Sequence, residues 1–220
     1  LFVIIFITPF TANSQNCKVG FAGNYLISRT ESFNTSWYNG INFGVPLRRE
    51  YSKKWAIESG IFYNQYTINE NNFMNCPLLP KEPNEVAELK LKNLQIPFLV
   101  DYNLGKGIRK LSTSINGGLA MSYYIKSNRK SEEFCQGNVI FSNSNSLAYV
   151  NRFKISLIVG VNLNYKLNEK YDLRLSYSKR NDFSSVTQAN GESVVEMNSF
   201  GIGVLYNFFT KPELPELIKD

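Results

Sequence analysis

The sequence of 220 residues contains no histidine. Without an imidazole the chain lacks a Ser-His or Cys-His pair that could activate a nucleophile, and it has no histidine ligand for zinc. The clustered carboxylates are Glu132 with Glu133 and Glu58 with Asp101, and no other sequence feature supports either pair as an acid–base site. No glycine-rich phosphate loop is present either. We therefore expect a protein that is not an enzyme and that binds no cofactor or metal.

Long apolar runs are also missing. The one continuous run, Leu1–Ile7, is far shorter than the roughly twenty residues of a transmembrane helix, which excludes a polytopic helical membrane protein. Thr8-Pro9 and the small-x-small pattern Ala12–Ser14 follow this run. The pattern predicts part of a secretory signal peptide over residues 1–14. A buried N-terminal strand is the alternative.

Basic residues are in excess, with a formal net charge of +6, but they form no stripe interleaved with aromatics on any one element. They gather in two expected turns: Arg48, Arg49, Lys53 and Lys54 in the first, and Lys106, Arg109 and Lys110 in the second. This distribution indicates solvated turns near anionic surfaces, and we expect no nucleic-acid partner.

Alternation of apolar with small or polar residues is the dominant pattern that is present. A period of two places side chains on opposite faces of a strand, and about ten tilted residues cross a bilayer. Eight such stretches are expected: Lys18–Ser28, Trp37–Leu47, Trp55–Thr67, Leu89–Leu104, Leu111–Ile125, Val150–Leu167, Tyr171–Arg180 and Val195–Phe208.

The connections between these stretches are alternately short and long. The long polar ones are Arg29–Ser36, Ile68–Glu88, Lys126–Tyr149 and Asn181–Val194. Outer-membrane barrels have short periplasmic turns and longer external loops. The alternation predicts an all-β fold, an eight-stranded antiparallel up-and-down transmembrane β-barrel over residues 15–209.

One face of the strands carries large apolar side chains, and the other carries glycine, serine and asparagine. A soluble lipocalin-like barrel would bury the apolar face around a small ligand. Phe and Tyr on nearly every strand would overfill so narrow a lumen, and aromatics at the strand ends fit interfacial girdles. These aromatics include Trp37, Trp55, Tyr63, Tyr102, Tyr165, Tyr171 and Tyr177. We therefore expect the apolar face to contact outer-membrane lipid.

The segment Leu94–Tyr102 (LQIPFLVDY) resembles the signature of the PorT-like outer-membrane β-barrel proteins, and Gly117–Tyr123 is similar to the fifth strand of that family. The resemblance implies an eight-stranded barrel in the outer membrane of a Gram-negative bacterium. Function varies within the family, so the type IX secretion role of its namesake does not transfer. Pro97 lacks a ladder donor, which favours a β-bulge near the start of its strand.

The end of the last strand, Tyr206–Phe209, resembles the aromatic-terminated signal that the barrel-insertion machinery reads, which makes that machinery an expected partner. Residues 210–220 (TKPELPELIKD) follow it. Their prolines and acidic residues predict a polar periplasmic tail rather than a folded element.

Four charged residues project to the polar face within strands, and these are Glu58, Asp101, Lys154 and Arg174. In an eight-stranded barrel the seventh strand lies across the lumen from the third. We therefore expect Arg174 and Glu58 to meet near the periplasmic end, with Asp101 beside them. Such a lumen charge cluster is either a structural plug, which pairs charges that are costly to bury alone, or a gate for ions.

The three cysteines are Cys17, Cys76 and Cys135. Cys17 is next to the expected cleavage site, but the residues before it do not resemble a lipoprotein signal. Cys76 and Cys135 fall in the second and third external loops, where an oxidising compartment permits either a disulfide or two free thiols. We expect neither loop to bury enough apolar surface to order itself.

Together these patterns predict an outer-membrane barrel with a filled lumen that acts as a structural or binding module. An unknown protein or surface ligand would bind its external loops. The alternatives are a narrow transport pore, a component of a protein-secretion complex, and a secreted soluble barrel.

Overall fold

The computed structural model describes residues 17–30, 37–72, 85–106, 110–135, 138–145, 150–183 and 194–208. The strands are β1 (Cys17–Thr30), β2 (Tyr38–Glu50), β3 (Trp55–Asn72), β4 (Glu85–Lys106), β5 (Leu111–Cys135), β6 (Asn138–Asn145), β7 (Phe153–Lys166), β8 (Tyr171–Asp182) and β9 (Val195–Asn207). Within those ranges no helix is long and apolar enough to cross a membrane. The expected signal peptide and periplasmic tail, residues 1–14 and 210–220, lie outside the described residues.

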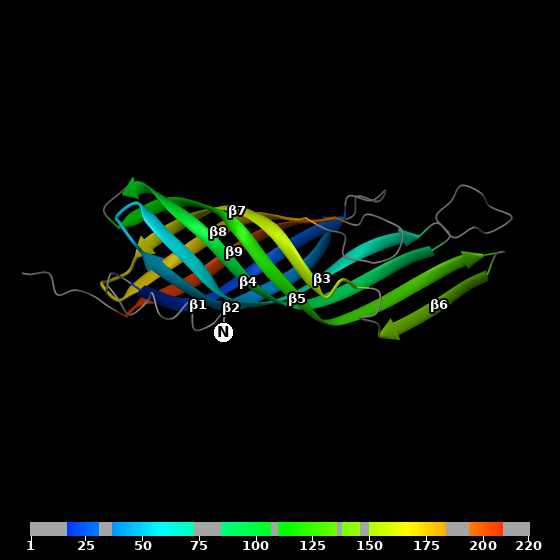
Figure 1. Ribbon diagram of the computed structural model, residues 1–220. Helices are drawn as coiled ribbons and strands as arrows, with labels where there is room; N and C mark the ends of the chain where they lie inside the picture. The colour runs from blue at the N-terminus through cyan, green and yellow to red at the C-terminus, as the bar shows by residue number, and fades with distance from the viewer. Residues whose placement is uncertain are drawn as a thin grey trace, which may run out of the picture.

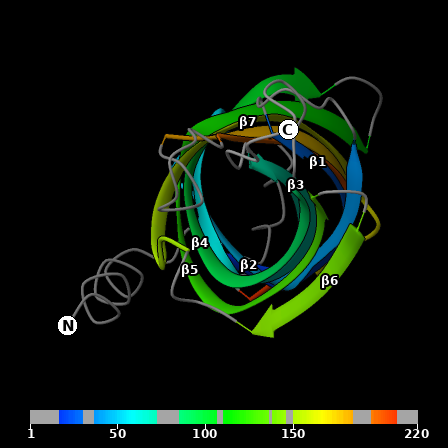
Figure 2. The same cartoon turned by 90° about the vertical axis from the view of Figure 1, so that its right-hand side faces the viewer.

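Eight of the strands close into a barrel in which every neighbouring pair is antiparallel. The order is β4-β3-β2-β1-β9-β8-β7-β5, and pairing between β4 and β5 completes the ring. Figure 2, viewed from the end at which β6 lies, shows the strands encircling a central lumen. The predicted eight-stranded antiparallel barrel is confirmed, and the short turns mark its periplasmic end.

The two faces of the barrel wall differ as the period-two pattern predicts. Phe21, Ile61 and Val159 are among the many large apolar side chains exposed on the outer surface, and Phe21 is 77% exposed. Inward positions are buried and largely small or polar, as with Asn42 and Ser114. The outward apolar assignment is therefore correct, because only a lipid environment removes this exposed surface from water.

Aromatic pairs mark the periplasmic rim of the outer surface. Trp55 packs on Tyr102 with ring centroids 4.6 Å apart, and Tyr171 lies 5.3 Å from Tyr206. Tyr206 also meets Phe208 edge to face. Trp55 and Tyr171 are exposed, as expected for rings that sit at the headgroup level of a membrane.

Several strands continue past the barrel at its external end, where loops were expected. The β3–β4 ladder runs on to the pair Asn72–Glu85, and β5 runs to Cys135 before the chain returns as β6. This four-stranded extension, β3-β4-β5-β6, is the external sheet, and it projects beyond the barrel in Figure 1. The prediction that these connections could not order themselves is wrong for these parts, because their backbones satisfy one another in continuous ladders.

A cluster of buried apolar side chains lies at the base of the external sheet. We call it the external cap, and its members are Leu26, Tyr66, Ile68, Leu89, Leu91, Tyr124, Val150, Val195 and Met197. Tyr66 and Tyr124 share a hydrogen bond between their hydroxyls. Two tyrosines thus enter a lumen that was expected to be too narrow for rings on nearly every strand, and they fill its external end.

The β-bulge expected at Pro97 is wrong. The β4–β5 register shifts at Lys92/Asn93 and at Asn103/Gly105 instead. Pro97 lies in the middle of β4, where the β3–β4 ladder is interrupted. The register between β3 and β4 is the same on both sides of the interruption, so Pro97 lies opposite Gly60. Gly60 has φ +153°, and a Cβ there would lie 2.4 Å from the carbonyl oxygen of Val45, so only glycine fits.

Candidate functional site

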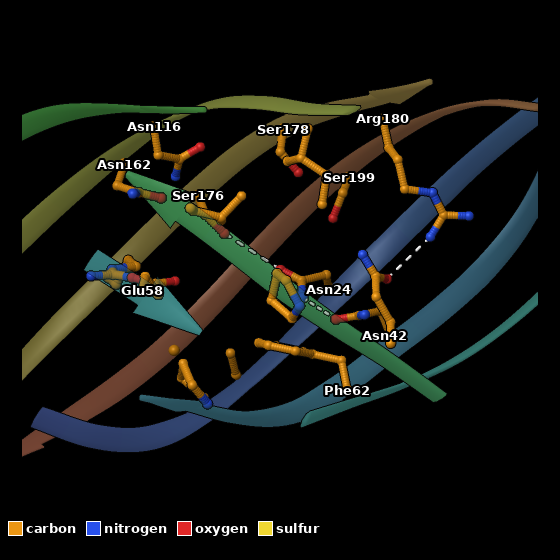
Figure 3. Close-up of a pocket in the computed structure, with 18 of the residues that line it drawn as sticks. Asn24, Asn42, Glu58, Phe62, Asn116, Asn162, Ser176, Ser178, Arg180 and Ser199 are labelled. Carbon is orange, nitrogen blue, oxygen red and sulfur yellow. Dashed lines mark hydrogen bonds and ion pairs between the residues drawn. The ribbon is translucent and has the colours of Figure 1, made fainter. Parts of the chain in front are cut away.

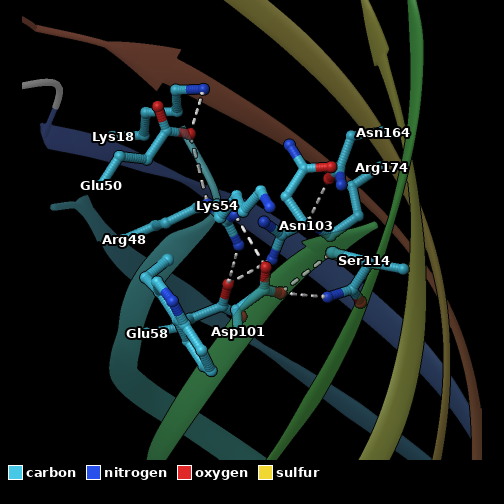
Figure 4. Close-up of polar contacts among 12 residues, drawn as sticks. Lys18, Arg48, Glu50, Lys54, Glu58, Asp101, Asn103, Ser114, Asn164 and Arg174 are labelled. Atoms are coloured by element: carbon cyan, nitrogen blue, oxygen red, sulfur yellow. Dashed lines mark hydrogen bonds and ion pairs between the residues drawn. The ribbon is translucent and has the colours of Figure 1, made fainter. Parts of the chain in front are cut away.

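Charged side chains from four strands meet inside the lumen near its periplasmic end. We call Arg48, Glu58, Asp101 and Arg174 the periplasmic charge network (Figure 4). Arg48 Nη2 lies 2.9 Å from Asp101 Oδ1, and Arg48 Nη1 lies 3.6 Å from Glu58 Oε2. Arg174 Nη1 contacts the same Glu58 oxygen. All four residues are buried, so these are charge pairs withdrawn from bulk water.

Neutral side chains add hydrogen bonds to this network, although Arg48 Nη1 and Arg174 Nη2 are buried without a hydrogen bond in the described part of the chain. Asp101, which is 0% exposed, accepts hydrogen bonds from Ser114 Oγ at 3.0 Å and from Asn162 Nδ2 at 2.9 Å. Arg174 Nε donates to Asn164 Oδ1 at 2.9 Å. Two guanidinium groups thus face two carboxylates, and the extra hydrogen bonds offset part of the desolvation cost. Glu50, which is 3.5 Å from Arg48 Nε, is paired with Lys18.

The structure brings together Glu58 and Arg174 from opposite walls of the barrel. Asp101 joins them through Arg48, a residue that is expected from sequence in a solvated turn. That assignment is wrong, because Arg48 and Arg49 both belong to β2 and are buried. Arg48 continues the inward alternation of Asn42 and Pro46, and this period-two signal could have identified it.

Lys154 lies apart from the other three predicted charges, in a group closer to the external cap. We call Lys154, Arg180 and Asp182 the external charge cluster. Lys154 Nζ is 3.0 Å from Asp182 Oδ2, both side chains being fully buried, and Arg180 Nε is 3.4 Å from Asp182 Oδ1. Ser156 Oγ also donates to Asp182 at 2.7 Å. Asp182 was missed because β8 was expected to end at Arg180.

An arc of amide side chains lies between these two groups of charges. Asn24 donates to Asn42, Asn42 donates to Asn64, and Asn64 Nδ2 donates to Gln95 Oε1 at 2.8 Å. The arc ends where Arg180 Nη1 donates to the same Gln95 oxygen at 3.1 Å. We call Asn24, Asn42, Asn64 and Gln95 the amide belt, of which Figure 3 labels Asn24 and Asn42. Asn24 lies opposite Asn42 and Asn42 opposite Asn64 in the strand registers, so these side chains share one level of the lumen.

The space that remains inside the barrel is small. A cavity of about 110 Å³ lies within the amide belt, and Arg174 and Arg180 contribute to its lining. A second cavity of about 240 Å³ lies at the periplasmic mouth. Its wall includes Lys18, which is 2.8 Å from Glu50 and 2.7 Å from Asp172. The external cap, the amide belt and the charge network therefore fill successive levels of the lumen.

The remaining predicted site residues give less information. Cys76 lies outside the described residues, and Cys135 is described only by its backbone, which pairs with Asn138. The disulfide between them stays a prediction. Cys17 is a free thiol at the start of β1. In the described part of the chain, no group of three or more His, Cys, Asp or Glu side chains could hold a metal ion.

A closed barrel with an apolar outer surface, aromatic pairs at its rim and a largely polar interior is typical of the class of outer-membrane β-barrel proteins. The chain belongs to the family described as the outer membrane protein beta-barrel domain, which matches residues 13–208. The predicted location in the outer membrane of a Gram-negative bacterium is confirmed.

Solved structures with a similar fold belong to diverse proteins. Ail of Yersinia pestis is 12% identical, with a TM-score of 0.47, and covers 89% of this chain and 100% of its own. Neisserial surface protein A is 14% identical, with a TM-score of 0.49, and the match covers 87% of this chain and 97% of that protein. The outer membrane protease OmpT of Escherichia coli is 9% identical, with a TM-score of 0.42, and the match covers 89% of this chain and 98% of that protein. The comparison with curated proteins gives no match.

Proposed function

We propose that this protein is a non-enzymatic binding module of the cell surface and that its external sheet carries the binding surface. The observation that supports this most is the continuation of β3, β4 and β5 beyond the barrel, with β6 added outside it. The filled lumen supports the same function, because side chains of the described residues occupy the lumen at successive levels and leave no open channel through it. A partner would therefore bind at the external end of the barrel.

The free edge of β6 is the proposed contact surface. Among the described strands, β6 pairs only with β5, so one row of its backbone N–H and C=O groups has no neighbouring strand. Natural sheets commonly protect such edges with charged residues or proline. The β6 sequence NVIFSNSN contains neither. An extended segment of a partner polypeptide, added as a further strand, is the occupant that suits this edge.

The β5–β6 register identifies the backbone groups that would bind. Only two residues separate Cys135 from Asn138, so this pair closes the hairpin with hydrogen bonds between its own backbone groups. Opposed pairs then alternate along an antiparallel ladder. By this alternation, Val139, Phe141 and Asn143 direct their N–H and C=O groups toward the free edge.

A proline at the free edge is expected to abolish strand addition. The probe is a labelled peptide with the sequence of residues 128–135, the segment of β5 that already pairs with β6, with serine in place of cysteine. We expect Asn143→Pro to weaken peptide binding to protein in nanodiscs by about tenfold or more, because it removes an edge donor without touching the β5 ladder. Fluorescence polarisation measures the binding.

Asn143→Ala is the matched control, since it removes the same side chain and keeps the N–H. Its affinity should equal that of the wild-type protein. A peptide N-methylated at alternate residues should also fail to bind. Equal binding to the proline variant, or no binding to the wild-type protein, would contradict strand addition at β6.

A narrow transport pore is the alternative function, and conductance separates the two. The external cap buries Tyr66, Ile68 and Leu91 almost completely, and dry apolar packing opposes the passage of ions. We therefore expect the reconstituted protein to show no stable single-channel conductance in planar bilayers. Reproducible channel openings would favour the pore.

Further parts of the proposal rest on the sequence. They are membership of the PorT-like group, recognition of Tyr206–Phe209 by the barrel-insertion machinery, a possible place in a secretion complex, and the division into residues 1–14, 15–209 and 210–220. A disulfide between Cys76 and Cys135 would tie the β3–β4 connection to the β5–β6 hairpin and so fix the binding surface.

A further inference from the structure

We propose that the lumen holds one small monovalent anion, such as chloride, beside Arg180. The proposal is independent of the external binding surface. It rests on three features of the described residues: an unbalanced buried charge, a surplus of hydrogen-bond donors at the same level, and a cavity of suitable size against the Arg180 side chain.

The external charge cluster carries two cations and one carboxylate. Lys154 and Arg180 both contact Asp182, and no other carboxylate among the described side chains contacts either of them. In the periplasmic charge network, by contrast, Arg48 and Arg174 face Glu58 and Asp101, and Glu50 at its edge is a further carboxylate in contact with Arg48. An uncompensated charge in a site withdrawn from water is costly, so a bound anion would stabilise the cluster.

Hydrogen-bonding groups near the cluster show the same imbalance. Arg180 Nε, Asn93 Nδ2 and Ser122 Oγ are buried and make no hydrogen bond within the described part of the molecule. Strand register places Ser122 between Gln95 and Lys154, at the level of the cluster. All three groups can donate, and an anion accepts from several donors at once. Arg180 Nε is 3.4 Å from Asp182 Oδ1 without a hydrogen bond between them.

The cavity within the amide belt provides the space. Its volume of about 110 Å³ suits a halide with a few waters, because one water needs roughly 10–15 Å³ by this measure. Asn64 and Gln95 line it together with Arg180, Ser178 and Ser199, the last three of which are labelled in Figure 3. Glu58, the one carboxylate among the described residues of the lining, is paired with Arg174. The external cap closes the lumen on the external side of this cavity.

Thermal unfolding in detergent, at constant ionic strength, tests the proposal with two anions of different size. Chloride is expected to raise the unfolding temperature of the wild-type protein by about 2–4 °C relative to gluconate, which is too large for the cavity. Gln95→Glu should abolish this difference, because the new carboxylate lies where Arg180 Nη1 is already 3.1 Å from an oxygen.

Two further variants complete the design. Arg180→Gln removes the excess cation and should also abolish the chloride effect. Lys18→Gln is the matched control, because Lys18 is a lumen cation with two carboxylate partners at the periplasmic mouth, and it should keep the full chloride effect. The proposal is overturned if the wild-type protein unfolds at the same temperature in chloride and in gluconate. That result is expected if Lys154 is neutral, because Arg180 and Asp182 would then balance each other. A chloride effect that persists in Gln95→Glu does the same.

Crystals grown in bromide locate the ion directly by anomalous diffraction. The expected result is one peak inside the barrel within hydrogen-bond distance of the Arg180 guanidinium, lost in Gln95→Glu. Peaks confined to the protein surface would mean an adventitious ion only, and they would overturn the proposal, as would the absence of any peak in the lumen.

Discussion

Arg174→Ala is expected to lower the free energy of unfolding by about 3–5 kcal/mol, because it leaves Glu58 as an incompletely paired carboxylate inside the barrel. Arg48 then lies 3.6 Å from Glu58 and must also serve Asp101, so it cannot replace the lost contact. Water entering from the periplasmic mouth would reduce the loss toward the lower end of this range. Urea titration of the barrel folded into lipid vesicles measures the change.

A double-mutant cycle assigns this loss to the pair. Combining Arg174→Ala with Glu58→Gln removes both charges and should recover part of the stability, giving a coupling energy of about 1–3 kcal/mol. Lys179→Ala is the control, because Lys179 is half exposed and pairs with Glu196 away from the periplasmic charge network. It should cost about 1 kcal/mol or less. Additive losses for Arg174 and Glu58 would contradict the pairing.

The same variant separates a structural plug from a gate. Arg174→Ala removes a cation at the periplasmic end and leaves Tyr66, Ile68 and Leu91 of the external cap in place. A plug that stabilises the barrel therefore predicts lower stability and no conductance. A gate predicts that Arg174→Ala opens a path for ions.

The barrel could be predicted from sequence because its two physical requirements repeat along the chain. Each strand must alternate between lipid and lumen, and the backbone must close on itself in a bilayer. The contact between Glu58 and Arg174 could be predicted from sequence for the same reason. Strand count fixes which walls oppose each other, and distance from the periplasmic turns fixes the level of each residue in the lumen.

The external sheet could not be predicted in the same way, because nothing outside the membrane imposes a period or a length on it. Its order depends on ladders such as β5–β6, which are pairings between backbones rather than a pattern in one strand. Arg48 and Asp182 were missed for a related reason. Both lie at strand ends, where a polar residue looks like the start of a turn although the inward alternation continues through it.

The external charge cluster carries one excess cation, and we therefore expect substitution of the two partners of its Lys154–Asp182 ion pair to change the free energy of unfolding by different amounts. Lys154 and Asp182 are 3.0 Å apart and both are fully buried. Asp182→Asn leaves Lys154 and Arg180 as two buried cations without a carboxylate. The expected loss in free energy of unfolding is about 3–5 kcal/mol, because uncompensated buried charge is the costly outcome of breaking such a pair.

Lys154→Met is expected to cost about 1 kcal/mol or less, because Arg180 then pairs with Asp182 one to one and the methionine fills the space of the lysine stem. Asp172→Asn controls for the loss of a lumen carboxylate at the partly exposed periplasmic mouth, and it should cost about 1 kcal/mol or less. Urea titrations of the three variants under one lipid condition give the comparison. Equal losses for Lys154→Met and Asp182→Asn would mean that the pair acts as an isolated ion pair, with Arg180 contributing no excess charge to the site.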